Sequence, residues 1–174
     1  MSSQKRAHAT DTGPVQTSGG INVLITSAGR RVQLVTAFRH LLNQRGGGNI
    51  VAVDFSHLAP ATHLADRQFQ VPLVTSDEYL RTILELCADA QVALVVPTID
   101  TELSLLAGAR EDFRGRGIEV AVSDGETIAI SEDKERTHEW LRKHSFPTPS
   151  RLKRDVDGSI TIPAQCAVVV KPVG

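Results

Sequence analysis

Hydrophobic residues in this chain gather into short runs that alternate with longer amphipathic stretches. The short apolar runs predict five strands. They cover residues 21–26, 50–54, 68–71, 92–96 and 118–122. The stretches between them repeat apolar residues at helical spacing and predict helices over 32–44, 76–90 and 101–113.

Strands that alternate with helices of about 10–15 residues favour one architecture, a right-handed, doubly wound parallel sheet with helices on both faces. We therefore predict an α/β fold. Three consecutive glycines, Gly46 to Gly48, should end the first helix before the second strand begins.

The pattern changes after residue 123. A short helix is predicted over 126–130, and Ser131 should cap a longer helix that runs to about His144. Short strands near 150–153 and 167–170 then suggest the start of an antiparallel element. We expect three segments: a polar, disordered leader over 1–20, the doubly wound domain over 21–123, and over 124–174 linker helices with the truncated beginning of an α+β domain.

Composition narrows the functional classes. The 174 residues carry a formal net charge of −1, which argues against a general nucleic-acid or membrane surface. No run approaches the roughly 20 apolar residues of a membrane span, and the leader lacks the apolar core of a secretory signal. We expect a cytoplasmic protein. Its two cysteines, Cys87 and Cys166, lie too far apart in sequence to suggest a zinc site, and we expect both to be buried thiols.

Candidate chemistry lies in the loops that follow the strands, because open parallel sheets bind ligands beyond the carboxyl ends of their strands. Gly29, Arg30 and Arg31 follow the first strand. The two arginines stand at a helix N-terminus, where exposed N–H groups already favour an anion. They predict a phosphate or carboxylate site with Gly29 approaching the ligand, although two solvated arginines would give the same pattern.

Three carboxylates lie at the same predicted edge. Asp54 ends the second strand, 25 positions after Gly29, where a dinucleotide fold would hold a ribose hydroxyl. The glycine fingerprint G-x-G-x-x-G is absent, which disfavours a dinucleotide. Asp100 either caps the next helix or, with Glu102, receives a substrate ammonium or a metal.

Two lysines could hold a second anion. Lys134 falls near the third position of the helix capped by Ser131, and Lys171 ends the apolar run 167–170 just before Pro172. A lysine that ends a buried strand reaches either for an anion or for water. The six histidines show no metal-ligand spacing.

Several segments together resemble a known family. They are NVLITSAGRRVQLVTAF, IVAVDFSHLAPATHLAD, VVPTIDTEL, VSDGETIAISEDKERTHEWLRKHSFPTPS and VVVKPVG. This combination, over about residues 22–174, resembles the ATP-grasp proteins that are similar to the carbamoyl-phosphate synthase large subunit.

The resemblance implies that residues 22 to about 123 form a Rossmann-like preATP-grasp domain on the substrate side, followed by the start of the ATP-grasp domain. It assigns ATP contacts to Lys134 and Lys171. Such enzymes use MgATP to activate a carboxylate as an acyl phosphate, which an amine or another nucleophile then displaces. Their magnesium ligands follow the position of Gly174, so we expect this chain to hold none and to be inactive alone.

The implied partners are ATP and a small carboxylate, with a homodimer left open. Two other functions remain: a Rossmann-type nucleotide or dinucleotide enzyme, and a non-catalytic module that binds a small anion.

Overall fold

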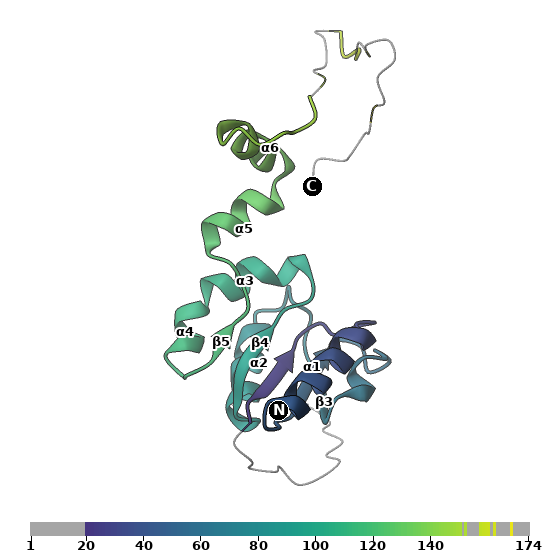
Figure 1. Cartoon of the computed structure of the whole chain (residues 1–174), viewed down its shortest axis with the longest axis vertical. Helices are drawn as coiled ribbons and strands as arrows, with labels where there is room; N and C mark the ends of the chain where they lie inside the picture. The colour runs from purple at the N-terminus through teal and green to yellow at the C-terminus, as the bar shows by residue number, and fades with distance from the viewer. Residues whose placement is uncertain (1–19, 151, 153–156, 161, 163–167, 169–174) are drawn as a thin grey trace, which may run out of the picture. The chain divides into compact units, whose positions relative to one another are not determined.

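The computed structural model describes residues 20–150, 152, 157–160, 162 and 168. The chain divides into two compact units, Met1–Gly125 and Glu126–Gly174, and each is described by itself. Unit 1 contains the sheet (Figure 1). Its strands are β1 (Asn22–Ile25), β2 (Ile50–Asp54), β3 (Arg67–Gln70), β4 (Val92–Val96) and β5 (Glu119–Val120).

The five strands form one parallel sheet in the order β3-β2-β1-β4-β5. Leu24 of β1 pairs with Val51 of β2 on one side and with Val95 of β4 on the other. The chain thus leaves β1 toward one edge and returns to β4 on the opposite side. The carboxyl ends of β1 and β4 form the topological switch point, where such sheets bind ligands.

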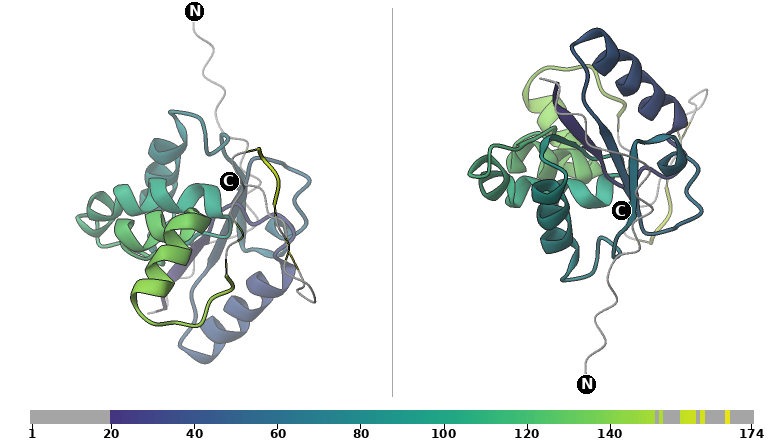
Figure 2. Two further views of the ribbon diagram at one scale, coloured as in Figure 1. Left: turned by 90° about the horizontal axis from the view of Figure 1, so that it is seen from above. Right: turned by 90° about the horizontal axis from the view of Figure 1, so that it is seen from below.

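Helices cover both faces of the sheet, as predicted (Figure 2). Helix α1 (Val32–Gln44) packs on one face through Val35 and Leu42, both buried. Gly46 to Gly48 follow with positive φ angles, and Gly47 N donates to Leu42 O at 2.8 Å. The predicted stop is confirmed, since glycine adopts this backbone without steric cost.

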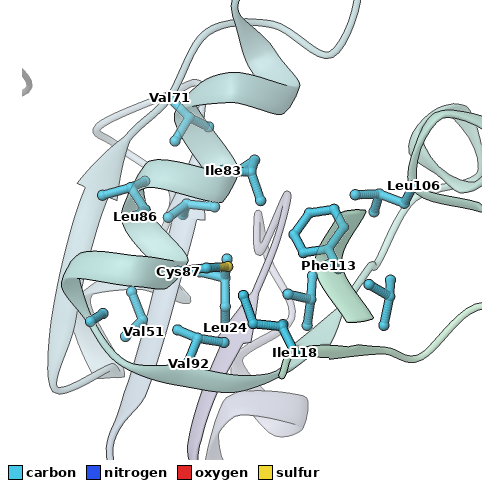
Figure 3. Close-up of a cluster of buried hydrophobic side chains, with 14 of the residues drawn as sticks. Leu24, Val51, Val71, Ile83, Leu86, Cys87, Val92, Leu106, Phe113 and Ile118 are labelled. Atoms are coloured by element: carbon cyan, nitrogen blue, oxygen red, sulfur yellow. The ribbon is translucent and has the colours of Figure 1, made fainter. Parts of the chain in front are cut away.

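The opposite face carries the larger core. Helices α2 (Tyr79–Asp89), α3 (Leu103–Gly108) and α4 (Arg110–Arg114) pack there. Figure 3 shows Ile83, Leu106 and Phe113 pointing toward Leu24 of the central strand. All four side chains are fully buried, so this face anchors the sheet beneath the switch point.

One predicted helix is divided. Residues 101–113 were expected to form a single helix, but the chain makes a 3-10 turn, η2 (Asp100–Glu102), and then α3 and α4. The break falls at Ala109, with φ −93° and ψ 4°. The preceding Gly108 has weak helix propensity and makes this a weak point.

In its described part, unit 2 contains two helices, α5 (Gly125–Glu132), whose first residue is the last residue of unit 1, and α6 (Lys134–Lys143). The predicted cap at Ser131 is wrong. Asp133 caps α6, and its Oδ1 accepts hydrogen bonds from Glu135 N at 2.7 Å and Arg136 N at 3.1 Å. These bonds hold the pKa of the Asp133 carboxyl below its usual value. Lys134 is therefore the first residue of α6.

Several predictions lie outside the described residues. They include the leader up to residue 19, most of the predicted antiparallel element, Cys166 and Lys171. Within the part that is described, no helix combines the length and apolar character needed to cross a membrane. The same part holds no group of three His, Cys, Asp or Glu side chains arranged for a metal ion.

Candidate functional site

Glu102 connects the loops at the switch point. Its side chain is completely buried, at 0% exposure, just after β4. Five donors surround its carboxylate: Thr26 Oγ1 at 2.9 Å, Ser27 Oγ at 3.0 Å, Tyr79 OH at 2.7 Å, Thr98 N at 2.8 Å and Ile99 N at 3.4 Å. These donors come from the loop after β1, the loop after β4 and the start of α2. The carboxylate therefore holds three segments together, and it faces its own loops rather than open space.

Two further contacts reinforce this connection. Thr98 Oγ1 lies 3.0 Å from Thr26 O and 2.6 Å from Ser27 O, so it donates to the β1 loop. Burial, followed by the charge and the hydrogen bond of Glu102, raises the pKa of Tyr79 far above its usual value. Tyr79 stays a neutral hydrogen-bond donor at physiological pH.

Asp54 fixes the shape of the Gly29 loop. Gly29 has a φ of +49°, in the left-handed region. Its N–H donates to Asp54 Oδ2 at 2.8 Å, and Ser56 N donates to Asp54 Oδ1 at 2.9 Å. Both carboxylate oxygens already accept backbone hydrogen bonds, and Asp54 is 8% exposed. Here Asp54 orders the loop through the backbone N–H of Gly29.

The two arginines differ from these carboxylates because they are exposed. Arg31 occupies the N-cap position of α1, whose first turn contains no acidic residue. Arg31 Nη2 lies 3.4 Å from Thr98 O, and Arg30 has no polar partner within the described part of the chain. Two positive charges at the positive end of a helix whose first turn has no acidic residue favour an anionic ligand.

A cavity of about 470 Å³ opens beside these residues. Four of the predicted site residues line it: Gly29, Arg30, Arg31 and Asp54. The sequence interpretation missed its apolar wall, formed by Phe55, Val71, Pro72, Leu73, Val74 and Ile99. Residues 71–74 follow the third strand. Open parallel sheets bind ligands beyond the carboxyl ends of their strands, and this rule, applied to the third strand, would have found them.

The remaining predicted residues lie elsewhere. Asp100 is exposed and begins η2 without capping it, and neither Asp100 nor Glu102 lines the cavity. Lys134 is exposed in unit 2, and Lys171 lies outside the described residues. The described residues thus bring Gly29, Arg30, Arg31 and Asp54 together at one cavity in unit 1, while the predicted anion site and ATP contacts stay predictions.

Comparisons with known proteins agree with this architecture. Residues 23–121 match the family model described as PylC-like, N-terminal domain. No curated protein sequence matches the chain significantly.

Among solved structures, the biotin carboxylase subunit of a pyruvate carboxylase is similar with a TM-score of 0.56 and 20% identity, over 80% of this chain and 31% of that one. The biotin carboxylase domain of 2-oxoglutarate carboxylase from Hydrogenobacter thermophilus, a dimer with MgADP, ADP and bicarbonate, has a TM-score of 0.55 and 17% identity, over 80% and 31%. The complete pyruvate carboxylase from Rhizobium etli has a TM-score of 0.54 and 14% identity, over 78% and 13%.

This chain spans about a third or less of the length of these proteins. At such low identity, the likeness concerns the fold, the α/β sheet of ATP-grasp carboxylases.

Proposed function

Because the chain belongs to the family of PylC-like N-terminal domains and has the preATP-grasp fold, we propose that it supplies the substrate side of an ATP-dependent carboxylate ligase. The substrate carboxylate binds at the switch point, against Arg30, Arg31 and the N-terminus of α1. The nucleophile is an amine or a related group.

One contrast carries this proposal. The acidic groups at the switch point, Glu102 and Asp54, already accept hydrogen bonds on both oxygens, whereas Arg30 and Arg31 are exposed beside a cavity. A ligand that enters the cavity meets guanidinium groups and helix N–H groups. Such a site favours an anion over a cation.

The proposed reaction has two steps. A carboxylate oxygen attacks the γ-phosphorus of ATP, the bond to the bridging oxygen breaks, and ADP leaves with that electron pair. The nucleophile then attacks the acyl carbon and inorganic phosphate departs. In the first step the chain's arginines hold the carboxylate in position, and positioning accounts for much of the rate in reactions of this kind.

The proposed ATP contacts rest on the family resemblance. Lys134, at the start of α6, and Lys171 are its proposed contacts with the nucleotide. Magnesium would neutralise phosphate charge. No described cluster fits the ion, so we place no magnesium ligand in this part of the chain. A homodimer and a cytoplasmic location complete the proposal, and sedimentation velocity would test the dimer.

Hydroxylamine trapping tests the activity. The protein that carries this chain, incubated with MgATP and a carboxylate, should release ADP and form a hydroxamate. Arg30→Ala should raise the KM for the carboxylate about tenfold with little change in the KM for ATP. The matched control is Arg116→Ala, an arginine of the separate groove on α2. An effect of Arg30→Ala confined to ATP would overturn the substrate assignment.

Two alternatives predict other outcomes. In a dinucleotide enzyme Asp54 would bind a ribose hydroxyl, whereas here its carboxylate accepts hydrogen bonds from Gly29 N and Ser56 N and orders the loop. A change in NADH fluorescence on titration would favour this alternative. A non-catalytic anion-binding module would bind its ligand without consuming ATP. Binding of a carboxylate without hydroxamate formation would therefore favour this second alternative.

A further inference from the structure

A groove of about 640 Å³ lies on the surface of unit 1. One side of α2 lines it, together with Arg116 from the turn after α4. Ile83, Leu86 and Cys87 of the same helix point into the core (Figure 3), so the groove follows a different side of α2. Among the described residues, none lines both this groove and the cavity beside Gly29, which makes the groove a separate surface.

Two rows of side chains run along this side of α2. Residues four apart in a helix follow one another in such a row. Leu80, Leu84 and Ala88 form the first row, and both leucines pack half-buried against the core. The second row is charged and exposed, and it consists of Asp77, just before the helix, Arg81, Glu85 and Asp89. Rows of this spacing are the ridges through which helices most often pack against each other.

The charges of the second row have few partners inside the molecule. Arg81 Nη2 lies 3.2 Å from Glu78 Oε1, but both side chains are 67% exposed, and such pairs contribute little. The carboxylates of Glu85 and Asp89 form no hydrogen bond or ion pair with any described residue. The row therefore keeps charges of both signs available to a partner molecule.

The mixed signs decide which partner fits. A purely basic surface would be attracted to Glu85 but repelled by Arg81, and a purely acidic surface would meet the reverse. The best match presents an acid and a base one helical turn apart, beside leucines. Helix α2 itself has that pattern, so a second copy of this chain fits the groove.

We propose that this groove is the contact between two copies of the chain, with α2 packed roughly antiparallel against α2 of the second copy. A two-fold axis midway between Arg81 and Glu85 places Arg81 of each copy opposite Glu85 of the other, beside the leucine rows. Rows of this kind cross at about 50°, so the helix ends diverge and keep Asp77 away from Asp89 of the second copy. The inference rests on the homodimer proposed above and gives it a surface.

Sedimentation velocity of the 174-residue chain tests the proposal. A contact made by one helix per copy is small, below roughly 1,200 Å², so we expect a Kd of about 10–100 μM. Arg81→Glu and Glu85→Arg each place like charges opposite one another twice and should each raise the Kd about tenfold or more. An equal mixture of the two variants should associate again, with about the wild-type Kd, because the acidic row of one variant then faces the basic row of the other.

The matched control is Arg114→Glu and Glu111→Arg, tested separately and mixed. These two residues pair at 2.7 Å on α4 and lie outside the groove lining, and their reversal changes the net charge by the same amounts. The control variants should keep the wild-type Kd. All four substituted positions are exposed on helices, so none of the changes should prevent folding.

Three results would overturn the proposal: a wild-type chain that stays monomeric at about 500 μM, groove variants that associate as the wild type does, or a mixture of them that stays monomeric. The first would also remove the homodimer and leave the groove to a different partner. The second would keep the homodimer and move its contact elsewhere. Because no groove residue lines the cavity at the switch point, the hydroxamate assay judges the ligase function independently.

Discussion

Two groups of charged residues lie within one switch point, and they are built in opposite ways. Glu102 is fully buried with five hydrogen-bond donors around it, whereas Arg30 is exposed and has no polar partner among the described residues. A buried charge that is fully paired contributes to the fold, and an exposed, unpaired charge at a cavity is available to a ligand. The contrast separates the residues that hold the loops from those that meet the substrate.

The largest effect should follow Glu102→Ala. This change leaves the hydroxyl groups of Thr26, Ser27 and Tyr79 and two backbone N–H groups without their acceptor. We expect the free energy of unfolding to fall by about 3 kcal/mol or more in urea denaturation. Glu102→Gln keeps the shape and one acceptor and should lose less than half as much. A loss below about 1 kcal/mol for the alanine variant would show that Glu102 does not hold the loops.

A titration at high pH tests Tyr79, which belongs to the buried group around Glu102. The pKa of Tyr79 is raised in the folded protein from its ordinary value of 10.0, so folded Tyr79 keeps a proton that the unfolded chain releases. Its contribution is complete below about pH 10 and decreases above it, by about 1.4 kcal/mol per pH unit. Unfolding free energies between pH 9 and 11 should fall more steeply in the wild type than in Tyr79→Phe.

Cys87 is present in both the wild type and Tyr79→Phe, so it changes their unfolding free energies equally at high pH. Burial raises the pKa of its thiol to about 12, which adds the same downward slope above pH 9 to each. The difference between the two curves therefore isolates Tyr79. Parallel curves would contradict the raised pKa of Tyr79.

Gly29→Ala tests the loop that presents the arginines. Its φ of +49° costs an L-residue about 1 kcal/mol, although a Cβ there would meet Ser27 O only at 3.6 Å. The free energy of unfolding should fall by about that amount. Gly108→Ala is the control, since a Cβ there meets nothing within 4 Å and it lies in α3. Equal effects of the two changes would argue against the strained loop.

The smallest effect on stability should follow Arg30→Ala. Because Arg30 has no polar partner among the described residues, the change should alter the free energy of unfolding by no more than about 0.5 kcal/mol. Arg39→Ala is the comparison, because Arg39 pairs with Asp66 at 2.8 Å and should lose about 1 kcal/mol. A larger loss for Arg30 than for Arg39 would place Arg30 among the structural residues.

The sequence predicted the sheet well because its signals are local. The runs at 50–54 and 92–96 and the helix over 32–44 have the predicted bounds, and glycines end that helix. The cap of α6 was missed because Ser131 and Asp133 both have capping side chains, and the backbone geometry decides between them.

The candidate site could be predicted only in part. The expectation that ligands bind beyond the carboxyl ends of the strands correctly grouped Gly29, Arg30, Arg31 and Asp54, which line one cavity. It also predicted Glu102 as a ligand-binding residue, like the arginines. Three of the five donors to Glu102 lie 23 to 76 residues away, Tyr79 and Thr26 among them, and such contacts leave no local signal. The apolar wall was missed because only polar loop residues were considered.

The location of the bound carboxylate tests the account most directly. Amide chemical shifts of the 174-residue chain should be recorded by NMR during a titration with hexanoate. The largest changes should occur at Gly29, Val32 and Thr101, beside the cavity, with no change at Arg81 and Arg116 in the groove on α2. Changes centred on that groove, with Gly29 unaffected, would contradict an anion site at the switch point.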